Sequence, residues 1–318
     1  MNLIHRNTAW RAHTIPARQH LLFGKFRLNR WLTWKNIWMA IGAASLLLLG
    51  CCTSSQTLPE PYDFEHGLVT SHVEQFSCNV SPLEQLGTRW SNREQQGIQL
   101  LAKPVSYAQV QEHSRKAHTK MLTEYIIVSD ERSDSLQVIK QRLQRVVQGR
   151  FPSYTFEIFL VEPKSGKKLI NAFCVGSHIY ITTDLLELAR DYPTTAFSVA
   201  HEMAHTINGH FHNHIRRFSL SQQYLGRPFG ALGAELYQKL VPAFNVPQEI
   251  QCDMSAVYLM AKAGYPPELA VNFLESYHRG HRDQPFLKFF RTHPTGPKRI
   301  TCLQGYINEA KVRAQSKH

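Results

Sequence analysis

The motif His201-Glu202-Met203-Ala204-His205 constrains this chain more than any other feature of its sequence. Two histidines four positions apart lie on the same face of an α-helix, so both rings can reach one metal ion. Glu202 is rotated by about 100° from His201, which places its carboxylate beside such an ion, where it can accept a proton from water. The motif therefore predicts a metal-binding helix. The competing interpretation is two solvated or capping histidines on a core helix.

A second pair of residues supplies what a zinc site on this helix lacks. Catalytic zinc takes three protein ligands and leaves a fourth position for water. Glu249 and Asp253 follow the motif at helical i and i+4 spacing, which puts them on one face of a second helix. We expect Glu249 to complete a site for one Zn²⁺ per chain, and Asp253 to accept the second ring proton of a zinc-binding histidine. Taken alone, such a pair is more often a solvated helix face.

Hydrophobic periodicity predicts a small sheet followed by many helices. The expected elements are helices at 107–125 and 135–147, strands at 154–161 and 178–182, and helices at 184–190, 195–215, 247–263, 267–278 and 297–311. This order indicates an α+β fold, with an active-site helix beside a small sheet and a mostly helical remainder.

The charge distribution separates the N-terminal segment from the rest of the chain. The formal net charge is +12, yet residues 1–50 contain seven basic side chains and no acidic one. The apolar run at 37–50 is shorter than the roughly 20 residues that a transmembrane helix needs. A basic segment followed by an apolar one is the order of an export signal, and Leu48-Leu49-Gly50-Cys51 resembles a bacterial lipobox. The alternative is an uncleaved signal anchor.

Cys51 is the predicted site of lipid attachment, so we expect a membrane partner. The resemblance to bacterial lipoproteins implies the periplasmic face of the outer membrane, because Cys52 is not the aspartate that usually retains a lipoprotein in the inner membrane. The periplasmic face of the inner membrane is the alternative. Removing the leader leaves a charge of +5, so no nucleic-acid partner is expected.

Four further cysteines are Cys78, Cys174, Cys252 and Cys302. Four cysteines allow three pairings, and the sequence does not choose among them. Four buried free thiols are an equally good interpretation.

The motif followed by the Glu249 and Asp253 pair is similar to the pattern of peptidase family M48, the gluzincins that include HtpX, the CaaX prenyl endopeptidase and BepA-type lipoproteins. Further matches extend the resemblance over residues 107–305. They are Asn171-Ala172-Phe173, Ala263-Gly264-Tyr265-Pro266, Thr292-His293-Pro294 and Arg299-Ile300. The resemblance implies a gluzincin-like metalloprotease that hydrolyses peptide bonds, with zinc as Lewis acid and Glu202 as general base.

The resemblance also implies roles for residues outside the motif. The segment Asn171-Ala172-Phe173 leads into a strand that edges the cleft and pairs with the substrate backbone. His293 approaches the cleft, where it stabilises an oxyanion or occupies the open zinc position; a helix-capping role is the alternative. This chain departs from the family pattern at Cys174, Gln251 and Cys252, and none of these is expected to touch a ligand.

Together these features predict a leader at 1–50, a lipid-anchored tether at 51–104 and a zinc metalloprotease domain at 105–318. Misfolded or misassembled envelope proteins are the expected substrates. One alternative is an envelope chaperone or assembly factor that uses the fold as a scaffold, and another is zinc storage by the histidine-rich segment after the motif. The apolar stretch 225–244 is a lid over the cleft or a surface that approaches lipid or a partner, and ordinary helical packing is the alternative.

Three histidines follow the motif, at His210, His212 and His214. We expect them to continue the metal helix and to lie mostly at its surface. His210 and His214 have the spacing of a second metal-binding pair, but no acid follows them as Glu202 follows His201.

Overall fold

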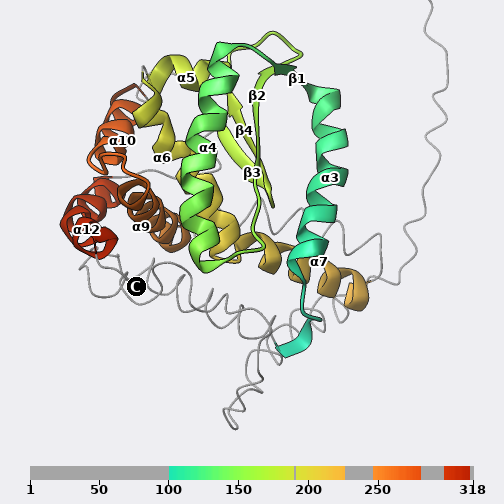
Figure 1. Ribbon diagram of the computed structural model, residues 1–318. Helices are drawn as coiled ribbons and strands as arrows, with labels where there is room; N and C mark the ends of the chain where they lie inside the picture. Colours follow the sequence, from blue (N-terminus) through green and yellow to red (C-terminus); the bar gives the residue numbers. More distant parts are fainter. Residues whose placement is uncertain (1–99, 190, 226–245, 281–296, 316–318) are drawn as a thin grey trace, which may run out of the picture. The chain divides into compact units, whose positions relative to one another are not determined.

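The computed structural model describes residues 100–189, 191–225, 246–280 and 297–315 (Figure 1). The elements that carry the argument are α3 (Tyr107–Glu124), β1 (Tyr125–Val128), α4 (Glu131–Arg150), β2 (Glu157–Pro163), β3 (Ala172–Val175), β4 (His178–Thr182), α5 (Thr183–Ala189), α6 (Tyr192–Ile207), α7 (His210–Leu225), α9 (Val246–Lys262), α10 (Leu269–Gly280) and α12 (Pro297–Gln315). The leader, Cys51 and most of the expected tether lie outside the described residues. In the described part of the chain, no helix is both long and apolar enough to cross a membrane.

The sheet has four strands in the order β1-β2-β4-β3. β1 is antiparallel to β2, β2 is parallel to β4, and β3 is antiparallel to β4, so the sheet is mixed. All five residues of β4 are buried, which fits its central place and its run of β-branched and aromatic side chains. β3 lies at one edge of the sheet and pairs with β4.

Helices cover both faces of this sheet (Figure 1). Alternate residues of β2, Ile158 and Leu160, belong to the main core with α4 and α6, whereas Phe159 and Val161 join a smaller cluster that includes Met121 of α3. This alternation follows from the two-residue period of a strand. The main core therefore lies on the face of the sheet that α6 contacts.

α6 is the most deeply buried of the described helices. It begins at the N-cap Asp191, whose carboxylate accepts a hydrogen bond of 2.6 Å from the backbone N–H of Thr194. Every residue from Thr194 to Ile207 except His205 is buried. α6 packs against α9, which in turn packs against α12, so three helices meet behind the sheet.

The α+β fold, with its small sheet and mostly helical remainder, is confirmed. The ends of most elements differ by a few residues from those expected, and two differences concern the elements themselves. The predicted helix 107–125 ends one residue earlier, and a strand that was not expected, β1, follows it directly. The expected long helix 195–215 is two helices, because Gly209 adopts a left-handed conformation (φ 74°) that ends α6 and lets α7 begin at His210.

Candidate metal centre

Two helices bring together the three expected ligands. α6 presents His201 and His205 one turn apart, and α9 presents Glu249 in its first turn. The Nε2 atoms of the two histidines are 3.2 Å apart, and the Glu249 carboxylate oxygens lie 3.2 Å from His201 Nε2 and 3.5 Å from His205 Nε2. Three potential ligand atoms therefore face one point.

These separations fit a small tetrahedral cation such as zinc. Zinc binds histidine nitrogen at about 2.0–2.1 Å, so neighbouring ligand atoms around a tetrahedral ion are separated by about 3.3 Å. The observed distances match that edge length, and the ligand atoms form one of two groups in the described residues that could hold a metal ion. Two imidazoles and one carboxylate leave a fourth position for water or substrate.

Asp253 lies one turn after Glu249 on α9 and contacts the far side of His201. Its Oδ1 is 2.9 Å from His201 Nδ1, so the imidazole turns Nε2 toward the Glu249 carboxylate. A carboxylate in this position fixes the tautomer and the orientation of a metal-binding histidine. The structure thus brings Asp253 to the expected place.

Arg299, at the start of α12, is a buried partner of these carboxylates that sequence reasoning did not assign to the site. Its guanidinium donates two hydrogen bonds to Asp253, of 2.6 and 2.7 Å, and lies 3.4 Å from Glu249. Burial alone would raise the pKa of Asp253, but the charge of Arg299 and the hydrogen bonds from His201 and Arg299 hold it below its usual value. The signal available in the sequence was the Arg299-Ile300 match, which gives no partner for the arginine.

The same carboxylates determine the pKa of the His201 ring. Burial would lower the pKa of its ring, yet hydrogen bonds and charges from Asp253 and Glu249 outweigh burial and raise the pKa to about 9. The site therefore stabilises positive charge at the position where the ligand atoms converge, as a cation site requires.

Glu202 lies on α6 between the two histidines and is 1% exposed. Burial raises the pKa of the Cys174 thiol on β3 well above its usual value, and the charge and hydrogen bonding of Glu202 raise it further. The Glu202 carboxylate is therefore close to the edge strand β3. A carboxylate at this place, next to the candidate metal ligands, is suited to accept a proton from water.

The segment Asn171-Ala172-Phe173 leads into β3, as expected for a cleft-edging strand. The carbonyl oxygen of Asn171 accepts a hydrogen bond of 3.0 Å from the backbone N–H of Thr182, and Ala172 is fully buried. The Phe173 ring stacks on Tyr180 of β4 at a centroid distance of 4.9 Å. Among the described strands, β4 alone pairs with this segment.

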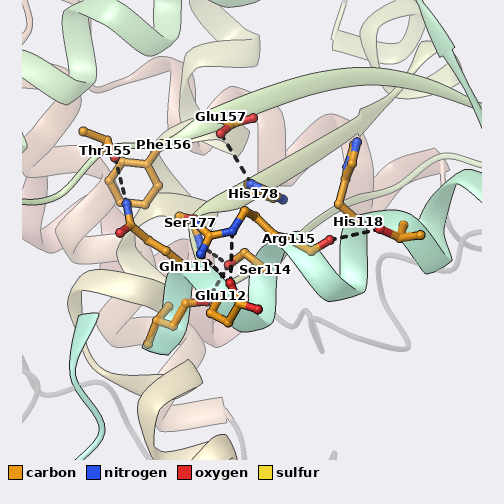
Figure 2. A network of polar contacts seen from close by, with 12 residues as sticks. Gln111, Glu112, Ser114, Arg115, His118, Thr155, Phe156, Glu157, Ser177 and His178 are labelled. Carbon is orange, nitrogen blue, oxygen red and sulfur yellow. Dashed lines mark hydrogen bonds and ion pairs between the residues drawn. The ribbon is translucent and has the colours of Figure 1, made fainter. Parts of the chain in front are cut away.

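The turn between β3 and β4 is clamped from two helices. Thr206, the residue after His205, donates a hydrogen bond of 2.5 Å to the carbonyl oxygen of Gly176. From α3, the Ser114 hydroxyl accepts a hydrogen bond of 3.0 Å from the backbone N–H of Ser177 (Figure 2). These two hydrogen bonds hold the turn after the edge strand against α6 and α3.

The three histidines after the motif contradict the expected surface placement. His212 is 2% exposed, and His210 and His214 are partly buried on α7, which is a separate helix and not a continuation of the metal helix. Burial lowers the pKa of both His210 and His212 to about 4. The interruption of the helix at Gly209 explains why the surface placement was wrong. The chain turns there, so α7 packs back against the domain.

Cys252 is also buried and lies near His210, at a distance of 3.5 Å from Sγ to Nδ1. Cys174 and Cys252 are free thiols, whereas Cys302 is disulfide-bonded. His293, Cys78 and the stretch 226–245 lie outside the described residues.

Comparison with known proteins identifies the family of this chain. The sequence pattern of Peptidase family M48 matches residues 131–307, more than half of the chain. The chain is also similar to the mitochondrial metalloendopeptidase OMA1 of Arabidopsis thaliana, with 27% identity over 149 residues. That match covers 42% of this chain and 29% of the relative, so the chain spans less than a third of the relative's length. The expected resemblance is confirmed, and the chain belongs to peptidase family M48.

Proposed function

We propose that this protein is a zinc-dependent metalloendopeptidase. Membership of peptidase family M48 supports a metalloendopeptidase. The observation that carries the proposal of zinc is the convergence of His201 Nε2, His205 Nε2 and the Glu249 carboxylate at distances of 3.2–3.5 Å. When bound there, zinc supplies Lewis-acid chemistry that polarises a peptide carbonyl and acidifies water.

The protein's own residues position the substrate and move the proton. Glu202 accepts a proton from the attacking water and delivers it to the leaving amine, as its place beside the metal ligands allows. Asp253, held by Arg299, keeps His201 in the orientation that binds the metal. No described strand pairs with the outer side of β3, so this side offers backbone N–H and C=O groups to an extended peptide, which favours recognition of backbone over side-chain identity.

His293 is the candidate for stabilising the oxyanion, a role that rests on its match to the family pattern. The test is His293→Ala, for which we expect a lower kcat with unchanged zinc content. Loss of zinc from this variant would instead make His293 a metal ligand.

We infer that the enzyme acts in the bacterial cell envelope, anchored through Cys51 to the periplasmic face of the outer membrane, on misfolded or misassembled envelope proteins. The acid-free leader and its lipobox-like end support export. The disulfide at Cys302 supports an oxidising compartment. Backbone recognition at β3 suits unfolded substrates, because these expose extended segments.

The second candidate is an envelope chaperone that binds unfolded chains without cleaving them. The observation that favours it is the same edge strand, since strand addition needs no chemistry. Complementation of a deletion strain by Glu202→Gln would favour this candidate.

The discriminating experiment is cleavage of an unfolded protein substrate by the wild type and by Glu202→Gln. We expect Glu202→Gln to retain one zinc per chain and to lose cleavage by a factor of about 10²–10⁴, the usual contribution of a general base. Glu187→Gln is the matched control, because Glu187 is an exposed acid on α5. Undiminished cleavage by Glu202→Gln would overturn the proposed mechanism.

A further inference from the structure

A chain of polar contacts leads from the metal ligand His205 on α6 to His210 on α7 and then to α9. His205 Nδ1 lies 3.0 Å from His210 Nδ1, at the first residue of α7. The other ring nitrogen of His210, Nε2, lies 3.4 Å from the Gln251 side-chain oxygen on α9. The Cys252 thiol lies 3.5 Å from His210 Nδ1.

The chemistry of a metal ligand fixes where the protons of this chain must lie. His205 Nε2 faces His201 and Glu249, so this nitrogen binds the metal and carries no proton. A neutral imidazole has one N–H donor and one acceptor nitrogen, so the proton of His205 is on Nδ1. His205 therefore donates to His210 Nδ1, which accepts, and the proton of His210 is on Nε2, where Gln251 is the acceptor.

We propose that His210 is a positioning residue for the metal ligand His205, and that it fixes the tautomer and ring orientation of this ligand by accepting its Nδ1 proton. The inference rests on the proposed metal site. It gives the two histidines of the motif different supports: His201 donates to a carboxylate that is paired with Arg299, whereas His205 donates to a neutral imidazole that is oriented by Gln251.

The break between α6 and α7 is what makes this contact possible. His210 follows Gly209, whose left-handed backbone turns the chain immediately after the metal helix. In an unbroken helix, residues five positions apart would point about 140° away from each other, so their rings would diverge. The turn instead brings the two rings to a centroid distance of 5.2 Å, edge to face.

His205, His210 and Cys252 also lie close enough together to suggest a second metal site. Such a site would use both nitrogens of His205 as ligands at the same time, and the ring would have to lose both of its protons. The hydrogen-bonded arrangement needs no such loss and satisfies both nitrogens of His210. The observations therefore favour a positioning role, and the second metal becomes an outcome of the test.

The test compares zinc affinity in the full-length protein by competition with a chromophoric chelator. Loss of an outer partner of a metal-binding histidine costs about 10–100-fold in affinity, and we expect that loss for His210→Ala. His210→Gln, which restores a side-chain acceptor, should recover part of it. His214→Ala is the matched control on the same helix and should bind zinc as the wild type does, because the His214 ring lies against Phe211, at a centroid distance of 6.2 Å.

A second measurement separates positioning from general loss of structure. In ¹⁵N-histidine-labelled, zinc-loaded protein, the His205 ring should show its proton on Nδ1 in the wild type, and this N–H signal should exchange with water faster in His210→Ala. Gln251→Met should leave the fold intact, as measured by circular dichroism, and weaken zinc binding less than His210→Ala does.

Two results would overturn the inference. One is a His210→Ala variant that folds and binds zinc within twofold of the wild type. The other is two zinc ions per chain in the wild type and one in His210→Ala, which would show a second metal site. Failure of the proposed metal site gives a different result. In that case, replacing His201 would leave the zinc affinity of the protein unchanged.

Discussion

Replacing Arg299 by methionine tests how the buried charges behind the metal ligands are balanced. Arg299 and Asp253 are each 1% exposed and share two hydrogen bonds, while Glu249 lies 3.4 Å from the guanidinium. Removing the guanidinium leaves two buried carboxylates, Asp253 and Glu249, and the single positive charge of a protonated His201 does not neutralise both. The loss of one partner of a buried ion pair costs about 3–5 kcal/mol, so we expect Arg299→Met to lower the free energy of unfolding of the metal-free protein by that amount.

The assay is urea unfolding followed by circular dichroism, with the free energy extrapolated linearly to water. The control is Arg313→Met, which breaks a partly exposed pair with Glu309 (2.7 Å) on the same helix and should cost less than about 1 kcal/mol. Adding Asp253→Asn to Arg299→Met should recover part of the loss, because neither charge then remains buried. The loss should also be smaller at pH 5 than at pH 8, since an uncompensated buried carboxylate takes up a proton more readily. If Arg299→Met costs no more than Arg313→Met, the reasoning about charge compensation is wrong.

Gly176→Ala should destabilise the fold by about 2 kcal/mol or more, because its Cβ would collide with Ser114 and Val110 and the residue has φ 61°. Gly166→Ala is the control, since Gly166 has a similar φ (66°) but open space around it. It should cost about 1 kcal/mol in the same urea assay. Equal losses of unfolding free energy in the two variants would show that α3 does not pack tightly against the turn at Gly176. The pKa of His212 falls from 6.5 to about 4 in the folded state through burial and the Arg216 charge, so the unfolded state binds more protons below pH 6.5 and stability falls as the pH drops from 6.5 to 4. At pH 5 this amounts to about 2 kcal/mol, and His212→Phe should lose that much less stability than the wild type between pH 7 and pH 5. Equal pH dependence of the two proteins would show that His212 is not held neutral.

The parts of the site that could be predicted are those with a local signal. The i and i+4 spacing places His201 with His205, and Glu249 with Asp253, on single helix faces without any tertiary information. The meeting of the two helices came from the family resemblance, since spacing within each helix says nothing about what packs against it.

Arg299 and His210 show why the rest could not be predicted. Arg299 reaches Asp253 across 46 residues, and nothing in its neighbourhood distinguishes a buried arginine from a solvated one. His210 was misplaced for a different reason, because Asn208-Gly209 is a readable helix stop and was overlooked within a long helical pattern. β1 was not predicted because it has only four residues and follows α3 directly, so no turn residues mark its start.

The most direct test of the central claim is a titration of the metal-free protein with zinc, in which cleavage of an unfolded protein is measured at each ratio of zinc to chain. We predict that cleavage rises in proportion to zinc and reaches a plateau at one equivalent. Glu202→Gln should bind the same equivalent and stay inactive. Full cleavage by the metal-free protein, or a plateau reached equally by Glu202→Gln, would contradict the assignment of this site to zinc-dependent peptide hydrolysis.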